Sequence, residues 1–269
     1  MTPEHKEQCV SYVLKVFPIS HARACKLMNC SRTKTYYKKK MPEKDQPIIE
    51  AIKQVIGTTR KGRGKVIPMV QRKHPQMSSS KIRRVYEKEG FSLMKKLKRR
   101  VRNNPNNPAV VPMQANQEWA IDFMHDSLAN GRQIRSFNII DPYNRECKGI
   151  YIRHSIPAIR VIEFLEQAIE KYGKPQFIRS DNGPEFISKR FQLWLNDNKI
   201  GWSKIRKGCP QENCFVERFN RTMREDFLDA NLFFSIDQAN ELAFEYQHEY
   251  NQVRPHESLN NLTPLEYAA

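Results

Sequence analysis

Short apolar runs separated by turn residues fill the second half of the chain. Three of them have the character of strands, at 119–123, 134–141 and 147–153. Turn residues such as Asn130-Gly131 lie between these runs, which indicates an antiparallel meander. Further along, the pattern predicts helices at 155–172 and 188–198 and strands at 177–181 and 201–205. Three strands followed by alternating helix and strand predict an α/β fold whose mixed sheet carries helices on both faces.

The first forty residues show helical patterns. Ser20 and Ser31 each stand where a helix N-cap is expected, and Asn29-Cys30 forms a turn between the two helices. This arrangement predicts a helix-turn-helix whose second helix enters a major groove, with a solvated basic hairpin as the alternative. The second helix would carry the DNA-contact candidates Arg32, Lys34 and Lys38.

A second helical module is predicted for residues 43–102. A proline-containing break at 41–47 precedes a helix at 48–56, and further helices are expected from Ile67 onward, at 80–88 and at 92–101. The last helix carries five basic candidates for DNA contact: Lys95, Lys96, Lys98, Arg99 and Arg100. Charge runs of this kind are usually solvated faces, but two of them on separate helical modules favour phosphate contact.

An Asn- and Pro-rich segment at 103–108 can sustain neither a helix nor a central strand, and it therefore predicts a linker. We expect a division into a helix-turn-helix module at 1–42, a second helical module at 43–102, a linker at 103–114, an α/β core at 115–234 and a helical tail at 235–269 that packs on the core. Within the tail, a helix is expected at 237–250. Arg254 and His256 either contact phosphate or fix the tail.

Basic residues are concentrated before the linker. The net charge is +17 and the pI is about 9.7. Residues 1–110 contain 27 Lys and Arg against 7 Asp and Glu, a balance of +20, whereas residues 111–269 contain 19 against 22, a balance of −3. This distribution indicates a polyanionic partner, although RNA or anionic lipid would also fit the charge alone. No apolar run reaches the ~20 residues that span a bilayer and no secretory signal is visible, so we expect a cytoplasmic protein without membrane contact.

The six cysteines form no Cys-x-x-Cys pair, so reduced thiols are expected. A zinc site built from His5, Cys9, His21 and Cys25, paired at i and i+4, is a weaker alternative because zinc sites usually contain a tight Cys-x-x-Cys knuckle.

Three acidic residues stand at positions that suit metal chemistry. Asp122 and Asp181 each end an apolar run, and the Asn-Gly-Pro that follows Asp181 forces the chain out of the sheet. Glu217 follows Asp181 after 35 residues, on a helical pattern. Converging carboxylates need cations, and Mg²⁺ or Mn²⁺ prefers such oxygen ligands. An aspartate that only starts a turn is the alternative for Asp181, and Asp126 and Asp141 are rival acids near strand ends.

At these residues the sequence resembles the DDE transposases of bacterial insertion sequences, in the branch similar to retroviral integrases. The matching segments are 119–122, 141–146, 181–186, 208–213, 216–220 and 250–256, in the family's order and spacing. The resemblance implies a ribonuclease H-like core at 115–234, in which the first strand lies beside the fourth. One departure is Glu212, where relatives more often have a neutral polar residue.

The resemblance further implies a DNA transposase that nicks transposon ends and joins the freed 3'-hydroxyl to target DNA. Asp122, Asp181 and Glu217 would be both the catalytic residues and the ligands of two Mg²⁺ ions, for which Mn²⁺ can substitute. Asn213, Arg221 and Arg224 would contact DNA in the core.

The implied partners are double-stranded DNA, as transposon ends and target, and further copies of this chain on that DNA. Relatives are often fused to an upstream-frame protein of the same element, so we also expect that partner, and nucleoid association in a bacterial cytoplasm. The alternative function is a catalytically silent regulator or inhibitor of transposition.

Overall fold

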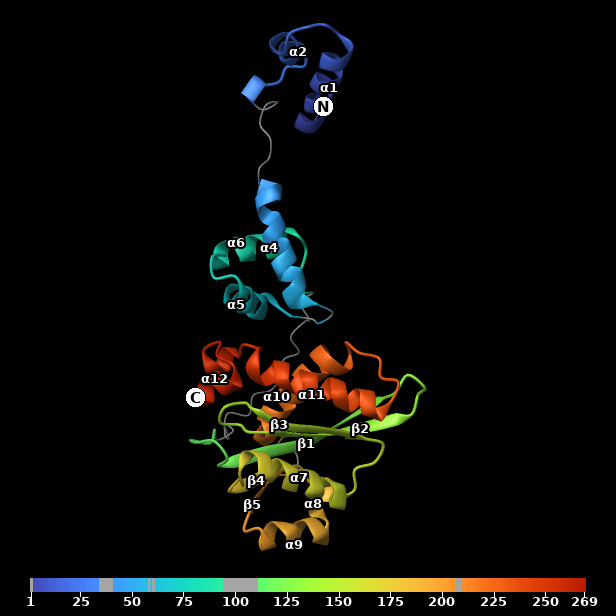
Figure 1. Cartoon of the computed structure of the whole chain (residues 1–269), viewed down its shortest axis with the longest axis vertical. Coiled ribbons are helices and arrows are strands. Elements are labelled where there is room, and N and C mark those ends of the chain that lie inside the picture. The colour runs from blue at the N-terminus through green and yellow to red at the C-terminus, as the bar shows by residue number, and fades with distance from the viewer. Residues whose placement is uncertain (1, 34–40, 58, 60, 94–110, 207–209) are drawn as a thin grey trace. The chain divides into compact units, whose positions relative to one another are not determined.

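The computed structural model describes residues 2–33, 41–57, 59, 61–93, 111–206 and 210–269 (Figure 1). The chain separates into two compact units, Met1–Glu50 and Ala51–Ala269. This division is coarser than the five parts expected from the sequence, and the five-part division stays a prediction.

The N-terminal unit contains the helices α1 (Pro3–Val16) and α2 (His21–Leu27). Ser20 caps α2 by accepting a hydrogen bond from the backbone N–H of Arg23, so the predicted cap is confirmed. Asn29 then turns the chain with a φ of 46°, a left-handed conformation that asparagine tolerates.

Three helices follow: α4 (Met41–Ile56), α5 (Arg63–Lys73) and α6 (Ser79–Lys88). The break expected at 41–47 is wrong, because α4 runs through it with Pro47 inside the helix. Proline removes one intrahelical donor, but the buried face formed by Ile48, Ala51, Ile52 and Val55 offsets that loss. α5 also begins earlier than expected. The helix predicted at 92–101 does not include 92 or 93, and its remainder lies outside the described residues.

A five-stranded sheet forms the centre of the second unit. Its strands are β1 (Glu118–Ser127), β2 (Gln133–Ile140), β3 (Cys147–Arg153), β4 (Phe177–Ser180) and β5 (Gly201–Lys204). The strand order is β3-β2-β1-β4-β5. β1, β2 and β3 pair antiparallel, whereas β4 pairs parallel with β1 and with β5. The predicted meander, and the expected position of the first strand beside the fourth, are confirmed.

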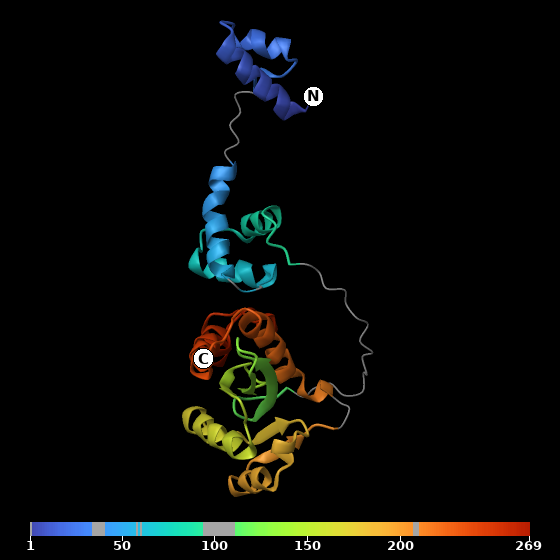
Figure 2. The same cartoon turned by 90° about the vertical axis from the view of Figure 1, so that its right-hand side faces the viewer.

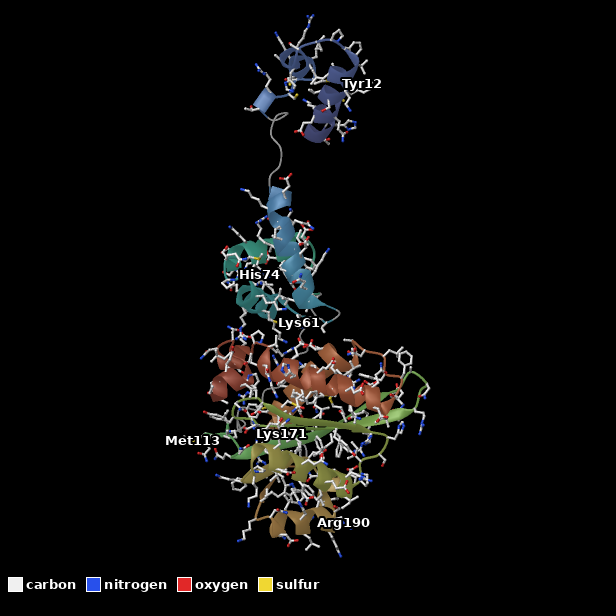
Figure 3. All side chains as sticks on the ribbon, in the orientation of Figure 1. Tyr12, Lys61, His74, Met113, Lys171 and Arg190 are labelled. Carbon is white, nitrogen blue, oxygen red and sulfur yellow. The ribbon has the colours of Figure 1, made fainter. Side chains whose placement is uncertain are left out.

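Helices cover both faces of this sheet (Figures 1 and 2). One face is covered by α7 (Ala158–Tyr172), α8 (Pro184–Ile187) and α9 (Lys189–Asp197). The other face is covered by α10 (Cys214–Met223), α11 (Ile236–Gln252) and α12 (Pro264–Ala268). Shorter turns connect them: η1 (Pro210–Asn213), a π-helical turn η2 (Arg224–Leu228) and η3 (Glu257–Leu259). Side chains fill the spaces between sheet and helices (Figure 3).

Strand alternation divides the apolar side chains of β1 between the two layers. Trp119 and Ile121 belong to the core shared with α7 and α9, whereas Ala120 belongs to the core shared with α10 and α11. Asp122 has the same parity as Ala120, so its side chain lies on the α10 face.

The C-terminal segment is fixed to the sheet by buried polar contacts. Asn251 of α11 exchanges two hydrogen bonds with the backbone of Cys147, and Asn240 exchanges two with the backbone of Ile152. Both pairs satisfy backbone groups of the edge strand β3. Arg254 pairs with Asp226, and both side chains are buried, so the structure favours the tail-fixing alternative for Arg254. None of the helices in the described ranges has the length and apolar character of a membrane span.

Candidate active site

Asp122 and Asp181 come abreast because β1 and β4 are parallel neighbours. Ala120 is opposite Arg179 in this pairing. Asp122 lies two residues after Ala120, and Asp181 lies two residues after Arg179. The same register, continued by two residues, places the two acids side by side where β4 ends. The sequence-predicted pair of strand acids is therefore brought to one edge of the sheet.

Both carboxylate oxygens of Asp122 accept hydrogen bonds. The backbone N–H of Phe123 donates to Oδ1 at 2.9 Å, and the side-chain amide of Asn220 donates to Oδ2 at 2.8 Å. Burial, with the nearby charges of Asp181 and Glu217, raises the pKa of Asp122 to about 6, although the two hydrogen bonds oppose this shift. The charges of Asp181 and Glu217 thus both act on Asp122.

The chain turns sharply at Asp181. Its Oδ1 accepts a hydrogen bond from the backbone N–H of Gly183 at 2.9 Å, and Pro184 then begins α8. Asn182 donates from its side chain to the carbonyl of Ile205 at 3.2 Å, which holds the turn against the segment after β5. The Asx-type turn considered as an alternative is therefore present, and it fixes the carboxylate at the site.

Glu217 reaches the site from α10, which packs on β1 and β2. Val216, Phe219 and Met223 form the buried side of this helix. Burial raises the pKa of Glu217, and the positive charge of Arg221 partly opposes that shift. The helical placement predicted from the spacing is confirmed.

The donor set suits a hard divalent cation. It consists of three carboxylates, and burial is the main cause of the raised pKa values of Asp122 and Glu217. Within the described ranges, no group of three or more His, Cys, Asp or Glu side chains already stands close enough to hold one metal ion. The fit therefore rests on the chemistry of these oxygen donors and on their common neighbourhood.

Residues 112–210 and 198–264 each match a family model described as an integrase core domain. The chain is 29% identical over 270 residues to an uncharacterized 39.2 kDa protein of insertion element IS476 from Xanthomonas euvesicatoria, which covers 100% of this chain and 78% of that protein. It is also 29% identical over 252 residues to an uncharacterized 31.7 kDa protein of insertion element IS407 from Burkholderia multivorans, which covers 93% of this chain and 91% of that protein. The chain belongs to the insertion-element transposases with an integrase core domain.

A solved structure supports the fold of this transposase. A chain of the simian T-cell lymphotropic virus intasome, determined in complex with the PP2A regulatory subunit B56 gamma, matches with a TM-score of 0.53. The match is 16% identical and covers 81% of this chain and 74% of that chain. The expected ribonuclease H-like fold with preceding helices is confirmed.

The transposase core places its three predicted DNA-contact residues in different environments. Asn213 is buried at the N-terminus of α10, and its Oδ1 has no hydrogen-bond partner within the described part of the chain. Arg221 lies one helical turn after Glu217 and acts on its charge. Arg224 donates to the carboxylate of Asp126 at 2.7 Å, so its guanidinium is already engaged.

Of the DNA-contact residues predicted in the N-terminal modules, only Arg32 lies within the described residues. Arg32 is exposed. The other predicted DNA-contact residues lie outside the described residues: Lys34, Lys38, Lys95, Lys96, Lys98, Arg99 and Arg100.

The zinc alternative is not supported. Cys25 lies 3.5 Å from His21 through its Sγ, but neither His5 nor Cys9 completes a metal-binding group among the residues that the structure describes. Cys25 instead packs in the small apolar core of the N-terminal unit with Val10.

Sequence reasoning missed two asparagines at the site. Asn220 follows Glu217 by three residues, a helical spacing that could have indicated a shared face. Asn138 of β2 stands opposite Asp122 in the antiparallel pairing, and only the strand register reveals this position. Of the rival acids, Asp141 is buried and accepts backbone hydrogen bonds from Asn116 and Tyr143, which gives it a structural role.

Proposed function

We propose that this transposase nicks the ends of its element and joins the freed 3'-hydroxyl to target DNA, with Asp122, Asp181 and Glu217 as its catalytic acids. The observation that supports this most is the parallel pairing of β1 with β4, which brings Asp122 abreast of Asp181, together with Glu217 on α10, whose charge, like that of Asp181, adds to the burial that raises the pKa of Asp122. Acids from a central strand, a turn and a helix, far apart in sequence, share one electrostatic neighbourhood. Perturbed carboxylates that converge in this way are typical of functional sites.

These three residues would hold two Mg²⁺ ions, for which Mn²⁺ can substitute. Integrase-type core domains use divalent metal, and the oxygen donors suit these ions. When bound, the ions would lower the pKa of the attacking water or hydroxyl and neutralise charge on the departing oxygen.

The protein's own contribution is to orient the carboxylates. Two hydrogen bonds restrain Asp122, and the Gly183 N–H restrains Asp181. Each oxygen of a carboxylate has a second lone pair, so these contacts leave room for a cation. Glu217 lies on a helix that packs on the sheet, so this packing fixes the position of its backbone.

DNA recognition would be divided along the chain. The balance of +20 in residues 1–110 supports assignment of end recognition to the N-terminal modules, because phosphate contacts by Lys and Arg provide most of the affinity for duplex DNA. The core, with a balance of −3, would contribute the chemistry and a few positioning contacts. Action on two ends at once would require several copies of the chain on the DNA.

The direct test is a strand-joining assay with the full chain and oligonucleotide duplexes that carry the ends of its own element. We expect nicked and joined products in Mg²⁺ or Mn²⁺, and binding without products in Ca²⁺, whose coordination is larger and looser. A silent regulator would bind the same duplexes and give no product in any of these ions. If Mg²⁺ yields binding alone, also after addition of the upstream-frame protein, the transposase proposal is overturned in favour of the regulator.

A further inference from the structure

A chain of buried side-chain amides ends on the carboxylate of Asp122. Asn138 donates from its Nδ2 to the Oδ1 of Asn220 at 2.7 Å, and Asn220 donates from its Nδ2 to the Oδ2 of Asp122 at 2.8 Å. The three residues belong to three elements, β2, α10 and β1. One continuous set of hydrogen bonds therefore connects both neighbouring elements to the acid on the central strand.

The direction of this chain of hydrogen bonds is set by charge. An ionised carboxylate can only accept, so Asn220 must present its NH₂ group to Asp122. Its carbonyl oxygen then faces away and accepts from Asn138, which is fully buried at 0% exposure. The Oδ1 of Asn138 has no hydrogen-bond partner within the described ranges. A buried acceptor without a hydrogen-bond partner lowers the stability of the fold. The hydrogen bonds of Asn138 itself therefore do not explain why this residue stands at this position.

The same contacts restrain two of the three acids together. Asn220 and Glu217 lie three residues apart on α10 and share one face of that helix. The hydrogen bond from Asn220 to Asp122 therefore joins β1 to the helical turn of α10 that also carries Glu217. On the carboxylate itself, Phe123 occupies one oxygen and Asn220 the other, so the rotation of the Asp122 side chain is restricted.

We propose that Asn138 and Asn220 are positioning residues that set the Asp122 carboxylate and the Glu217 helix for a divalent cation. This inference rests on the proposed function, since it requires Asp122 to be a metal ligand. Residues that hydrogen-bond to a metal ligand and orient it commonly change metal affinity by about 10- to 100-fold when they are removed.

The test measures the affinity of the full chain for Mn²⁺ alone by calorimetry, together with the thermal unfolding midpoint. Asn220→Leu removes both hydrogen bonds of the amide at similar size, and we expect its affinity to fall about 10- to 100-fold. Asn138→Leu removes only the outer hydrogen bond and leaves the donor to Asp122 in place, so we expect a smaller loss, below about tenfold.

Asn251→Leu is the matched control. Asn251 is also a buried asparagine on the α10 and α11 side of the sheet, and its amide makes two hydrogen bonds, both to the backbone of Cys147. We expect this variant to lose stability as the other two do and to bind Mn²⁺ like the wild type. A merely structural role for Asn220 would give the same pattern for Asn220→Leu as for Asn251→Leu.

Asp122→Asn separates the two claims. If it binds Mn²⁺ as the wild type does, or if the wild type binds none, the proposed metal site fails and the positioning role fails with it. If Asp122→Asn loses affinity while folded Asn220→Leu stays within about twofold of the wild type, the positioning role alone is overturned. Should Asn220→Leu not fold, Asn138→Leu decides in the same way, because unchanged affinity in that variant would remove Asn138 from the proposal and with it the three-residue arrangement.

Discussion

Arg224 donates a hydrogen bond from its Nη1 to the Oδ2 of Asp126 at 2.7 Å, and its Nη2 donates to the carbonyl of His125. Asp126 follows Asp122 by four residues on β1, so the two acids have the same strand parity. The Arg224 side chain remains 35% exposed. The basic residue expected to meet DNA is thus held by an acid of β1, and a phosphate would have to compete with that acid.

Replacing Asp126 by Asn should therefore strengthen DNA binding. The change removes one negative charge beside the site and the ion pair of Arg224 with Asp126, and a partly exposed ion pair of this kind is worth about 1 kcal/mol, or roughly fivefold in affinity. Fluorescence anisotropy with a labelled duplex at low salt would measure it. Glu163→Gln is a matched control, because it removes the same charge from an arginine pair on α7, the opposite face. Equal binding by both variants would exclude competition between Asp126 and DNA.

The five basic residues at Lys95, Lys96, Lys98, Arg99 and Arg100 should contribute to the salt dependence of DNA binding. Their replacement by Gln should lower the slope of log affinity against log salt by roughly 0.9 for each phosphate that is no longer neutralised, up to about 4.5. The control replaces five exposed basic residues of the core by Gln: Lys171, Lys174, Lys189, Arg190 and Lys199. Lys171 and Arg190 are labelled in Figure 3. An equal change of slope in both variants would defeat the assignment of end recognition to the N-terminal modules.

The sequence predicted the elements of the sheet well because their signals are local. The predicted bounds of β3 match the observed ones, and the predicted Ser20 cap of α2 follows from residue chemistry that acts within one turn. The break expected around Pro47 is wrong because the deciding interaction is not local. Burial of one face of α4 overrides the helix-breaking tendency of proline. The partners of the acids depend on register and packing. Asn138 lies opposite Asp122 only after β1 pairs with β2, and Asp126 meets Arg224 only after the start of η2 packs beside β1, which no local pattern contains.

His256 should make stability fall in mild acid. Burial lowers its pKa to about 4 from an ordinary 6.5, and the charge of Arg254 adds to this shift. Below about pH 6.5, His256 therefore binds a proton in the unfolded chain but stays neutral in the folded chain until the pH approaches 4. Stability is full above pH 6.5 and is lost as the pH falls toward 4, by up to about 3 kcal/mol. Urea unfolding at several pH values should show a smaller acid loss in His256→Phe, which keeps a ring against Tyr250 and cannot protonate. Identical pH profiles would contradict the assignment.

Two glycines should respond differently to alanine although both are crowded. A Cβ on Gly149 would lie 2.7 Å from Cζ of Phe164, a ring that stacks on Tyr151 and cannot move freely. A Cβ on Gly201 would lie 2.3 Å from Cδ1 of Phe177, but that side chain is 45% exposed and can swing outward. We expect Gly149→Ala to cost about 1–3 kcal/mol in the free energy of unfolding and Gly201→Ala less than about 1 kcal/mol. Denaturant titration would test the order, and a larger cost for Gly201→Ala would refute it.

The central claim is that Asp122, Asp181 and Glu217 together carry out the chemistry, and the most direct measurement is the rate of Mg²⁺-dependent nicking of the element's ends by three conservative variants. Asp122→Asn, Asp181→Asn and Glu217→Gln each remove one anionic oxygen ligand and preserve its shape, so each should reduce nicking by orders of magnitude while DNA binding stays near that of the wild type. If any of the three nicks in Mg²⁺ at close to the wild-type rate, that residue is not part of the site and the three-acid account is contradicted.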